Sequence, residues 1–307
     1  MEIPSRPSGP AWSCPSWLIP RLVSDARFAR AYDALGDQRR VFLKGLIADH
    51  FALTPPVPAL GSLCSQQFVS GLTRHVRATP RPFVLLLADA GLDAPALLLA
   101  ALMPCLCSGA ADVLVLRLGT RASLPDALLT ACELAGQERV AALGPALAAR
   151  LLSECALSGL PGLVLYPDTP DLRRIVGRPA LRAQLDASCL RLAPLRPPRA
   201  LGLWRDAPTQ FEAGRLGLLF GDRAFETGGA QPGRRPGKAP DDAAFAAFAA
   251  TPRDLLLVPD ARIGAGQGAA RLVVGESRTG LWTWPELSPE LFTVSTQAFS
   301  SAPARLS

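Results

Sequence analysis

Histidine, lysine, tyrosine and methionine are scarce in this 307-residue sequence, and the scarcity of histidine excludes the most. His50 and His75 are the only histidines. Protein zinc sites group cysteine and histidine ligands at short spacings. Cys105 and Cys107 form a pair, but no second pair and no nearby histidine completes such a set. We therefore expect no metal site.

Because lysine is nearly absent, the net charge of +6 comes almost entirely from arginine, which supplies 30 of the 32 basic residues. These arginines are spread along the chain among aspartate and glutamate, whereas a nucleic-acid site gathers basic residues into a patch or stripe. The densest basic run, residues 233–238, lies in a Gly- and Pro-rich segment typical of a loop. We expect a solvated surface and no nucleic-acid partner.

Long uncharged runs are also rare, and residues 94–111 form one that reaches the length of a short membrane-spanning helix. Pro104 interrupts this run, and strand-like apolar segments flank it closely. A helix buried against a parallel sheet accounts for both features, so we expect no membrane partner. The first twenty residues contain an acidic second position and several prolines, which is not the pattern of a signal peptide.

The number of cysteines is odd, whereas a framework of disulfides needs an even number. Several of them fall inside apolar helical patterns, which is typical of reduced core residues in a cytoplasmic protein. The seven stand at positions 14, 64, 105, 107, 132, 155 and 189.

What is abundant is apolar sequence, at 49% of residues, which is enough for one large α/β domain or two unequal lobes. Helical spacing in residues 24–50 and a Pro-rich stretch at 52–62 indicate a helical N-terminal module followed by a linker. We predict an N-terminal arm with helices over 1–60, a cofactor-domain-like lobe over 61–206 and a smaller C-terminal lobe over 207–307.

Strand and helix patterns alternate four times in the middle of the chain. Each predicted helix ends near a glycine, and the connections are short, which predicts right-handed crossovers in a Rossmann-like, doubly wound, mainly parallel sheet. The predicted strands cover 83–89, 112–118, 139–143 and 162–166, and the helices between and beside them cover 94–109, 124–136 and 145–159. Further strands are predicted at 200–206, 254–260 and 271–276.

In a sheet of this kind, ligands bind outside the carboxyl ends of the strands, where helix N-termini offer unpaired N–H groups. The loops at those ends cover 89–95, 119–125, 144–146 and 167–171, and we expect any small-molecule ligand of this lobe to contact them. The candidate residues are Asp89, Gly91, Gly119, Thr120, Gly144, Pro145, Ala146 and Asp168. A dinucleotide fingerprint is missing, because only Gly91 follows the first strand.

Residues 102–116 and 124–152 resemble the cofactor domain of histidinol dehydrogenases, within the aldehyde dehydrogenase-like superfamily. The resemblance covers about residues 83–167 and consists of small and apolar positions that fall in register. These are Pro104, Gly109, Pro125, Ala131, Leu134, Ala135, Gly136, Val140, Gly144, Ala146, Ala148 and Ala149. It implies the Rossmann-like fold of that family and a crevice for NAD or NADP.

The sequence departs from the family where the cofactor and the catalytic groups are bound. Asp89 stands in a loop that the family fills with glycines, Ala146 replaces a glutamine that contacts the dinucleotide, and Asp168 lies where a phosphate should approach. Carboxylates at those positions repel a pyrophosphate. The family's catalytic Glu-His pair is missing, and both histidines precede the matching region.

Two functions are compatible with this pattern. One is a divergent histidinol or aldehyde dehydrogenase-like protein that no longer acts as a histidinol dehydrogenase and instead binds a ligand or takes part in an assembly. The alternative is an NAD(P)-dependent oxidoreductase or acyl-CoA or aldehyde reductase with a cysteine nucleophile. Cys189 is the candidate nucleophile, because it follows the region of resemblance to the cofactor domain, residues 83–167, and precedes the second lobe. The resemblance also implies a homodimer.

Overall fold

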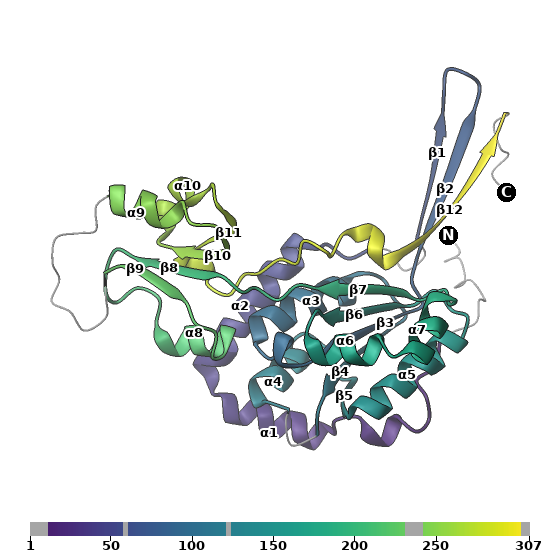
Figure 1. The fold of residues 1–307 in the computed structure, drawn as a ribbon, viewed down its shortest axis with the longest axis horizontal. Helices are drawn as coiled ribbons and strands as arrows, with labels where there is room; N and C mark the ends of the chain where they lie inside the picture. Colours follow the sequence, from purple (N-terminus) through teal and green to yellow (C-terminus); the bar gives the residue numbers. More distant parts are fainter. Residues whose placement is uncertain (1–11, 58–60, 121–123, 231–241, 302–307) are drawn as a thin grey trace, which may run out of the picture.

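The computed structural model of this protein describes residues 12–57, 61–120, 124–230 and 242–301. The basic run at 233–238 lies outside the described residues, as does part of the loop expected at 119–125. The strands of the described part form three sheets, which are labelled in Figure 1.

The first sheet is the predicted doubly wound, fully parallel one. Its central strand β3 is buried along its whole length, and Leu85 lies opposite Leu114 on one side and Val164 on the other. The strand order is β5-β4-β3-β6-β7. Strands β4 and β5 are added on one side of β3 and strands β6 and β7 on the other, so the order reverses between β3 and β6 although all strands are parallel. The strands are β3 (Phe83–Ala88), β4 (Asp112–Leu118), β5 (Val140–Leu143), β6 (Leu163–Pro167) and β7 (Arg191–Leu195).

Helices cover both faces of this sheet, and alternate residues of β3 enter the two layers. Val84 and Leu86 belong to the apolar cluster on the side of four helices, which are α1 (Asp25–Leu35), α2 (Asp37–Leu53), α3 (Pro95–Cys107) and α4 (Asp126–Leu134). Leu85 and Leu87 belong to the cluster on the opposite side, with α5 (Pro145–Leu157), α6 (Pro170–Val176) and α7 (Pro179–Asp186). This two-sided burial explains the continuous apolar runs of the strands.

The uncharged run at 94–111 is the buried helix α3, as predicted. Eleven of its residues are buried, on all sides of the helix, because it lies between the sheet and the N-terminal helices. No helix within the described ranges is long and apolar enough to cross a membrane.

The second sheet is also parallel, with the order β11-β10-β8-β9. Later strands are added first on one side of β8 and then on the other, so the order of strands along the sheet reverses between β8 and β10. One of its faces carries Trp204, which packs against Phe245 of the helix α9, and the other joins the apolar cluster of the first sheet through Leu203 and Leu257. Its elements are β8 (Leu201–Arg205), α8 (Ala213–Phe220), β9 (Glu226–Gly229), α9 (Asp242–Ala249), β10 (Arg253–Val258), α10 (Ile263–Gly266) and β11 (Ala270–Gly275).

The pairing of β8 bears on the expected division of the chain after residue 206. Because β8 pairs with β9 and β10, that division would separate β8 from its own sheet. A division just before Leu201 keeps both parallel sheets whole, and we propose the boundary there.

The third sheet is an antiparallel arm that projects from the body in Figure 1. A hairpin of β1 (Ser62–Gln67) and β2 (Thr73–Pro80) is joined by the strand β12 (Thr293–Ser300), which pairs with the other side of β2. Gly71 closes the hairpin at a φ of 84°, a left-handed conformation that glycine adopts without cost. The sequence patterns did not predict this sheet.

The segment between β11 and the arm contains two tryptophans, Trp282 and Trp284. Both Trp282 and Trp284 are buried core residues, and the Trp284 indole N–H donates to the carbonyl of Leu97 in α3 at 3.2 Å. The C-terminal part of the chain therefore leaves the second lobe and runs back across the first to reach the arm (Figure 1).

Candidate functional site

The carboxyl edge of the first sheet is where the sequence places a ligand. Parallel strands bring the candidate residues to this one edge in two groups. Asp89, Gly91 and Asp168 follow β3 and β6, on either side of the reversal in strand order. The second group follows the neighbouring strands β4 and β5 and consists of Gly119, Thr120, Gly144, Pro145 and Ala146.

In the first group the chain fills the space that a ligand would need. The Asp89 carboxylate is 7% exposed and accepts hydrogen bonds from the Gly91 N–H at 2.7 Å and from the Thr169 hydroxyl. A side chain at Gly91 would lie 2.8 Å from Cβ of Pro167 and 2.9 Å from Cγ2 of Thr169. The ends of β3 and β6 are thus packed directly against each other.

A residue from the second lobe holds the same loop from outside. Arg223, beyond the end of α8, donates to the carbonyls of Gly91 at 2.9 Å and Ala90 at 3.3 Å, and it forms an ion pair with Asp93. Opening the loop would therefore break a contact between the two lobes.

The two carboxylates of this group have opposite electrostatic surroundings. Burial raises the pKa of Asp89, and the hydrogen bonds from Thr169 and Gly91 oppose this rise only in part. The pKa of Asp168 is lowered, first by the hydrogen bonds from Arg173 and then by the positive charge of that arginine. Asp168 thus forms an ion pair with Arg173. The structure does not bring the carboxylates of Asp168 and Asp89 together.

The second group is a set of ordinary strand and helix ends. The Gly119 N–H donates to the carbonyl of Leu143 at 3.0 Å, which ties the end of β4 to β5. Gly144 is the N-cap of α5, Pro145 is its first residue, and Ala146 is exposed. A methyl group at position 146 offers no hydrogen bond to a ligand.

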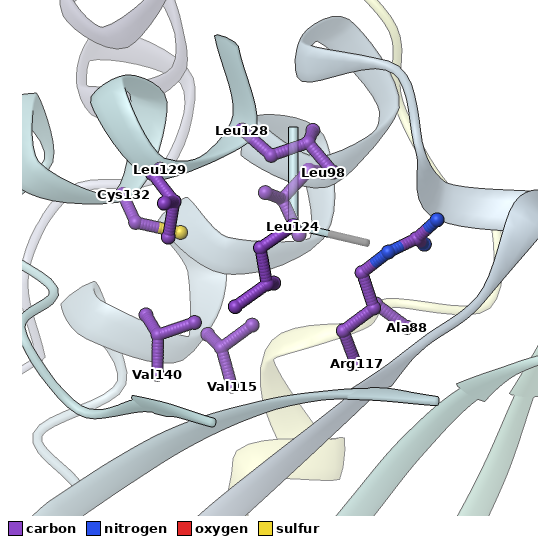
Figure 2. Close-up of a pocket in the computed structure, with 9 residues that line it drawn as sticks. All are labelled: Ala88, Leu98, Val115, Arg117, Leu124, Leu128, Leu129, Cys132 and Val140. Atoms are coloured by element: carbon purple, nitrogen blue, oxygen red, sulfur yellow. The ribbon is translucent and has the colours of Figure 1, made fainter. Parts of the chain in front are cut away.

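The space beneath this part of the edge is an apolar pocket between the sheet and helices α3 and α4. Figure 2 shows Leu124 at its centre, between Val115 and the leucines of the two helices. Its cavity volume is about 10 Å³, which is close to the minimum for one water molecule. A small-molecule site usually needs ~300 Å³ or more.

The described residues of this edge leave no room for a dinucleotide between β3 and β6. The passage between β3 and β6 is filled by residues 167–169, the buried Asp89 carboxylate would repel a pyrophosphate, and the neighbouring pocket is too small for an adenine ring.

The candidate nucleophile is not at this edge. Cys189 is exposed, in the turn between α7 and β7, and β7 runs parallel to the other strands. It therefore lies at the amino edge of the sheet, a strand length of ~16 Å from the crevice loops at ~3.3 Å per residue. The structure does not bring Cys189 together with the other predicted site residues.

The remaining cysteines and histidines provide no other centre in the described ranges. Cys105, Cys107, Cys132 and Cys155 are buried as predicted, and burial raises their pKa values, to about 12 for Cys132 and Cys155. Cys64 and Cys189 are exposed instead of belonging to the core. No group of three or more potential metal ligands is found among the residues that the structure describes.

The arm is the surface that sequence reasoning missed. All six residues of β1 are exposed, and so are five residues of β12, among them Phe299 at 60%. Leu63 and the hairpin residue Val69 also expose their side chains. The sequence signal was weak because neither strand has an apolar face, although both segments, 62–67 and 293–300, are free of charge and proline.

No protein-family model and no curated protein matches this chain. Solved structures do match it. The histidinol dehydrogenase of Elizabethkingia anophelis is 10% identical, with a TM-score of 0.51 over 91% of this chain and 76% of that chain. At this identity the likeness is one of fold, and it confirms the histidinol dehydrogenase-like fold that the sequence resemblance implies.

Two further matches are more distant. Indole-3-acetaldehyde dehydrogenase is 12% identical, with a TM-score of 0.40 over 90% of this chain and 80% of that chain. HpcC from Thermus thermophilus is 14% identical, with a TM-score of 0.38 over 78% of this chain and 44% of that chain.

Proposed function

We propose that this chain, which has a histidinol dehydrogenase-like fold, is an assembly protein that pairs with a second copy of itself, and that it is not an active histidinol dehydrogenase. One observation carries the proposal. The arm is a three-stranded sheet whose two outer strands contain no charged residue and no proline.

Within the described residues, the edges of the arm have none of the features that usually prevent strand pairing. Proteins protect an open edge with charged side chains, prolines, bulges or a covering element. Here the charged side chains of the arm, Arg74 and Arg77, are on the central strand β2. The outer strands β1 and β12 present mostly small and amide side chains that a neighbouring strand can accept.

A second copy is the occupant that this edge fits. The strand β12 is eight residues long, and two copies can pair antiparallel about a two-fold axis, so that the same edge is used by both. Such pairing would extend each three-stranded arm into a six-stranded sheet. It would also cover part of the exposed Phe299.

The closed crevice supports the second half of the proposal. Asp89, Gly91 and Thr169 pack against one another where the related fold would admit a cofactor, and Cys189 lies at the opposite edge of the sheet. The seven free cysteines support a reducing, cytoplasmic location, which we also propose.

The mass of the protein in solution tests the pairing. Light scattering coupled to size-exclusion chromatography should give twice the chain mass of 32.4 kDa. Thr296→Lys, in the middle of β12, places like charges close together in the paired edge and should shift the protein to the monomer, less so at high salt. Leu157→Lys, at an exposed apolar residue of α5, is the matched control and should leave the mass unchanged.

Charge complementation makes the test specific to the strand edge. Thr296→Asp alone should also be monomeric, and mixing it with Thr296→Lys should restore the dimer because the opposed charges now attract. A monomeric wild-type protein at all concentrations, or a dimer that Thr296→Lys leaves intact, would overturn the proposal.

Cofactor titration tests the loss of dehydrogenase function. We expect neither NAD nor NADP, oxidised or reduced, to raise the melting temperature at millimolar concentration, because a ligand of the native state must stabilise it. A saturable shift would show that the crevice opens and would favour the oxidoreductase alternative.

A further inference from the structure

In the described part of the chain, the cavities at the carboxyl edge of the second sheet are larger than the pocket of the first. Two neighbouring cavities, of about 210 and 100 Å³, lie between α2 and the loops that follow β8 and β11. One water molecule occupies roughly 30 Å³ of the liquid, so the space corresponds to several waters or one small organic molecule. Phe42, Arg215 and Thr279 line both cavities.

The cavities lie at the edge of the sheet where open parallel sheets bind ligands, beside one of the two strands at the reversal in strand order. The strand order of the second sheet reverses between β8 and β10, and ligands of such sheets lie outside the carboxyl ends of the strands at that point. The loop after β8, residues 206–212, contributes Phe211 to the larger cavity, and the turn after β11 contributes Glu276. The fold therefore repeats, in its second lobe, the geometry that is closed in the first.

The loop after β8 is held in a fixed and costly conformation. Gln210 accepts hydrogen bonds from the N–H groups of Asp206 and Ala207, and its carbonyl accepts one from the buried Arg205. Phe211 has a φ of 57°, a left-handed conformation that is rare for a bulky side chain. Strained residues of this kind gather at ligand sites, where the surrounding contacts maintain them.

Arg215 has a hydrogen-bond donor that a ligand could pair with. Its guanidinium lies 4.6 Å from the centre of the Phe42 ring, which fixes the plane of the fork. Its Nε is buried and has no hydrogen-bond partner among the described residues. An arginine fork matches a carboxylate with two parallel hydrogen bonds.

The other charges around the cavities limit the ligand to a single negative charge. Glu212 and Glu276 line the larger cavity, and Asp49 lines the smaller one, where its ion pair with Arg278 at 2.6 Å neutralises it. Two unneutralised carboxylates repel a phosphate more strongly than a monocarboxylate. The aromatic walls Phe42 and Phe211 favour an apolar body.

We propose that these cavities bind a small monocarboxylate, with its carboxylate on Arg215 and its apolar body between Phe42 and Phe211. The proposal does not depend on the pairing of the arms, because the cavities and the arm share no residue.

Calorimetric titration with benzoate, acetate and inorganic phosphate tests the site in the full-length protein. Benzoate should bind saturably, acetate more weakly because it lacks the apolar ring, and phosphate not at all. Arg215→Gln should lower the affinity for benzoate at least tenfold. Arg182→Gln, at an exposed arginine of α7 paired with Asp186, is the matched control and should bind as the wild type does.

Glu212→Gln keeps the proposal testable even if Arg215→Gln fails to fold. Removing this exposed carboxylate should raise the affinity for benzoate roughly two- to threefold, because one repulsive charge is lost. A purely structural disturbance would not strengthen binding. No benzoate binding to the wild type, equal binding of phosphate, or an unchanged or weaker affinity in Glu212→Gln would overturn the proposal.

Discussion

Gly91 tests whether the crevice of the first sheet is closed, and Gly91→Ala is the substitution that reports it. The added methyl group would lie 2.8 Å from Cβ of Pro167 and 2.9 Å from Cγ2 of Thr169. Carbon atoms in contact prefer 3.5–4.0 Å. The ends of β3 and β6 would therefore have to move apart by most of an ångström, and this would also disturb the hydrogen bond from Gly91 to Asp89.

The expected cost follows from two opposing effects. Overpacking a filled site costs about 1–3 kcal/mol. Replacing glycine by alanine also restricts the unfolded chain, which returns about 0.4–1 kcal/mol to the folded state. We therefore expect Gly91→Ala to lower the free energy of unfolding by about 1–2 kcal/mol.

Gly144→Ala is the matched control, because Gly144 belongs to the same predicted cofactor edge but has no neighbour within 4 Å of the added methyl group. As a helix N-cap substitution it should cost at most about 1 kcal/mol. Urea unfolding of both variants gives the comparison. Adding Thr169→Ser to Gly91→Ala removes one clashing methyl and should recover part of the loss, whereas Thr169→Ser alone should change little.

The reasoning fails if Gly91→Ala is as stable as Gly144→Ala. In that case residues 167–169 do not press on Gly91, the crevice is open, and the objection to a cofactor there disappears.

Two further predictions concern pH. Burial raises the pKa of Asp89 above its unfolded value of 3.8. The stabilising contribution of this carboxyl group is therefore complete below pH 3.8 and is lost as the pH rises through the raised pKa of the folded state. In urea unfolding, Asp89→Asn should be at least as stable as the wild type at neutral pH and should lose that advantage below pH 3.8. His50 behaves in the opposite way, because burial lowers its pKa from 6.5 to about 4. The contribution of neutral His50 to the free energy of unfolding is complete above pH 6.5, and it falls by about 3 kcal/mol as the pH drops towards 4. His50→Gln should show a smaller fall over the same range, and an identical fall in both proteins would contradict the assignment to His50.

Strands β3 to β6 of the first sheet and helices α3 to α5 could be predicted because their signal is local. The apolar run of β3, the glycine that ends each helix and the proline that starts α5 each reflect the chemistry of a few neighbouring residues. The departures at Asp89 and Ala146 were visible for the same reason. The sequence could not tell that Asp89 meets Thr169, because the two residues are 80 positions apart and only the order of the strands brings them together.

The elements that sequence reasoning missed are those whose apolar faces are weak. The strand β7 lies at the edge of its sheet and alternates irregularly, and the three strands of the arm expose most of their residues. The position of Cys189 could not be predicted for a different reason, because its place in the sequence does not tell at which edge of the sheet it lies.

The sequence by itself therefore determined the parallel α/β character of this protein, its buried α3 helix and its resemblance to the histidinol dehydrogenase fold. These properties follow from residue types and short-range periodicity. Tertiary structure alone decided that the first crevice is filled, that the second sheet has cavities beside Arg215, and that the hairpin of residues 62–80 pairs with the strand 293–300 in an open-edged arm. Each of these depends on contacts between distant parts of the chain, which packing and strand order create and no local pattern encodes.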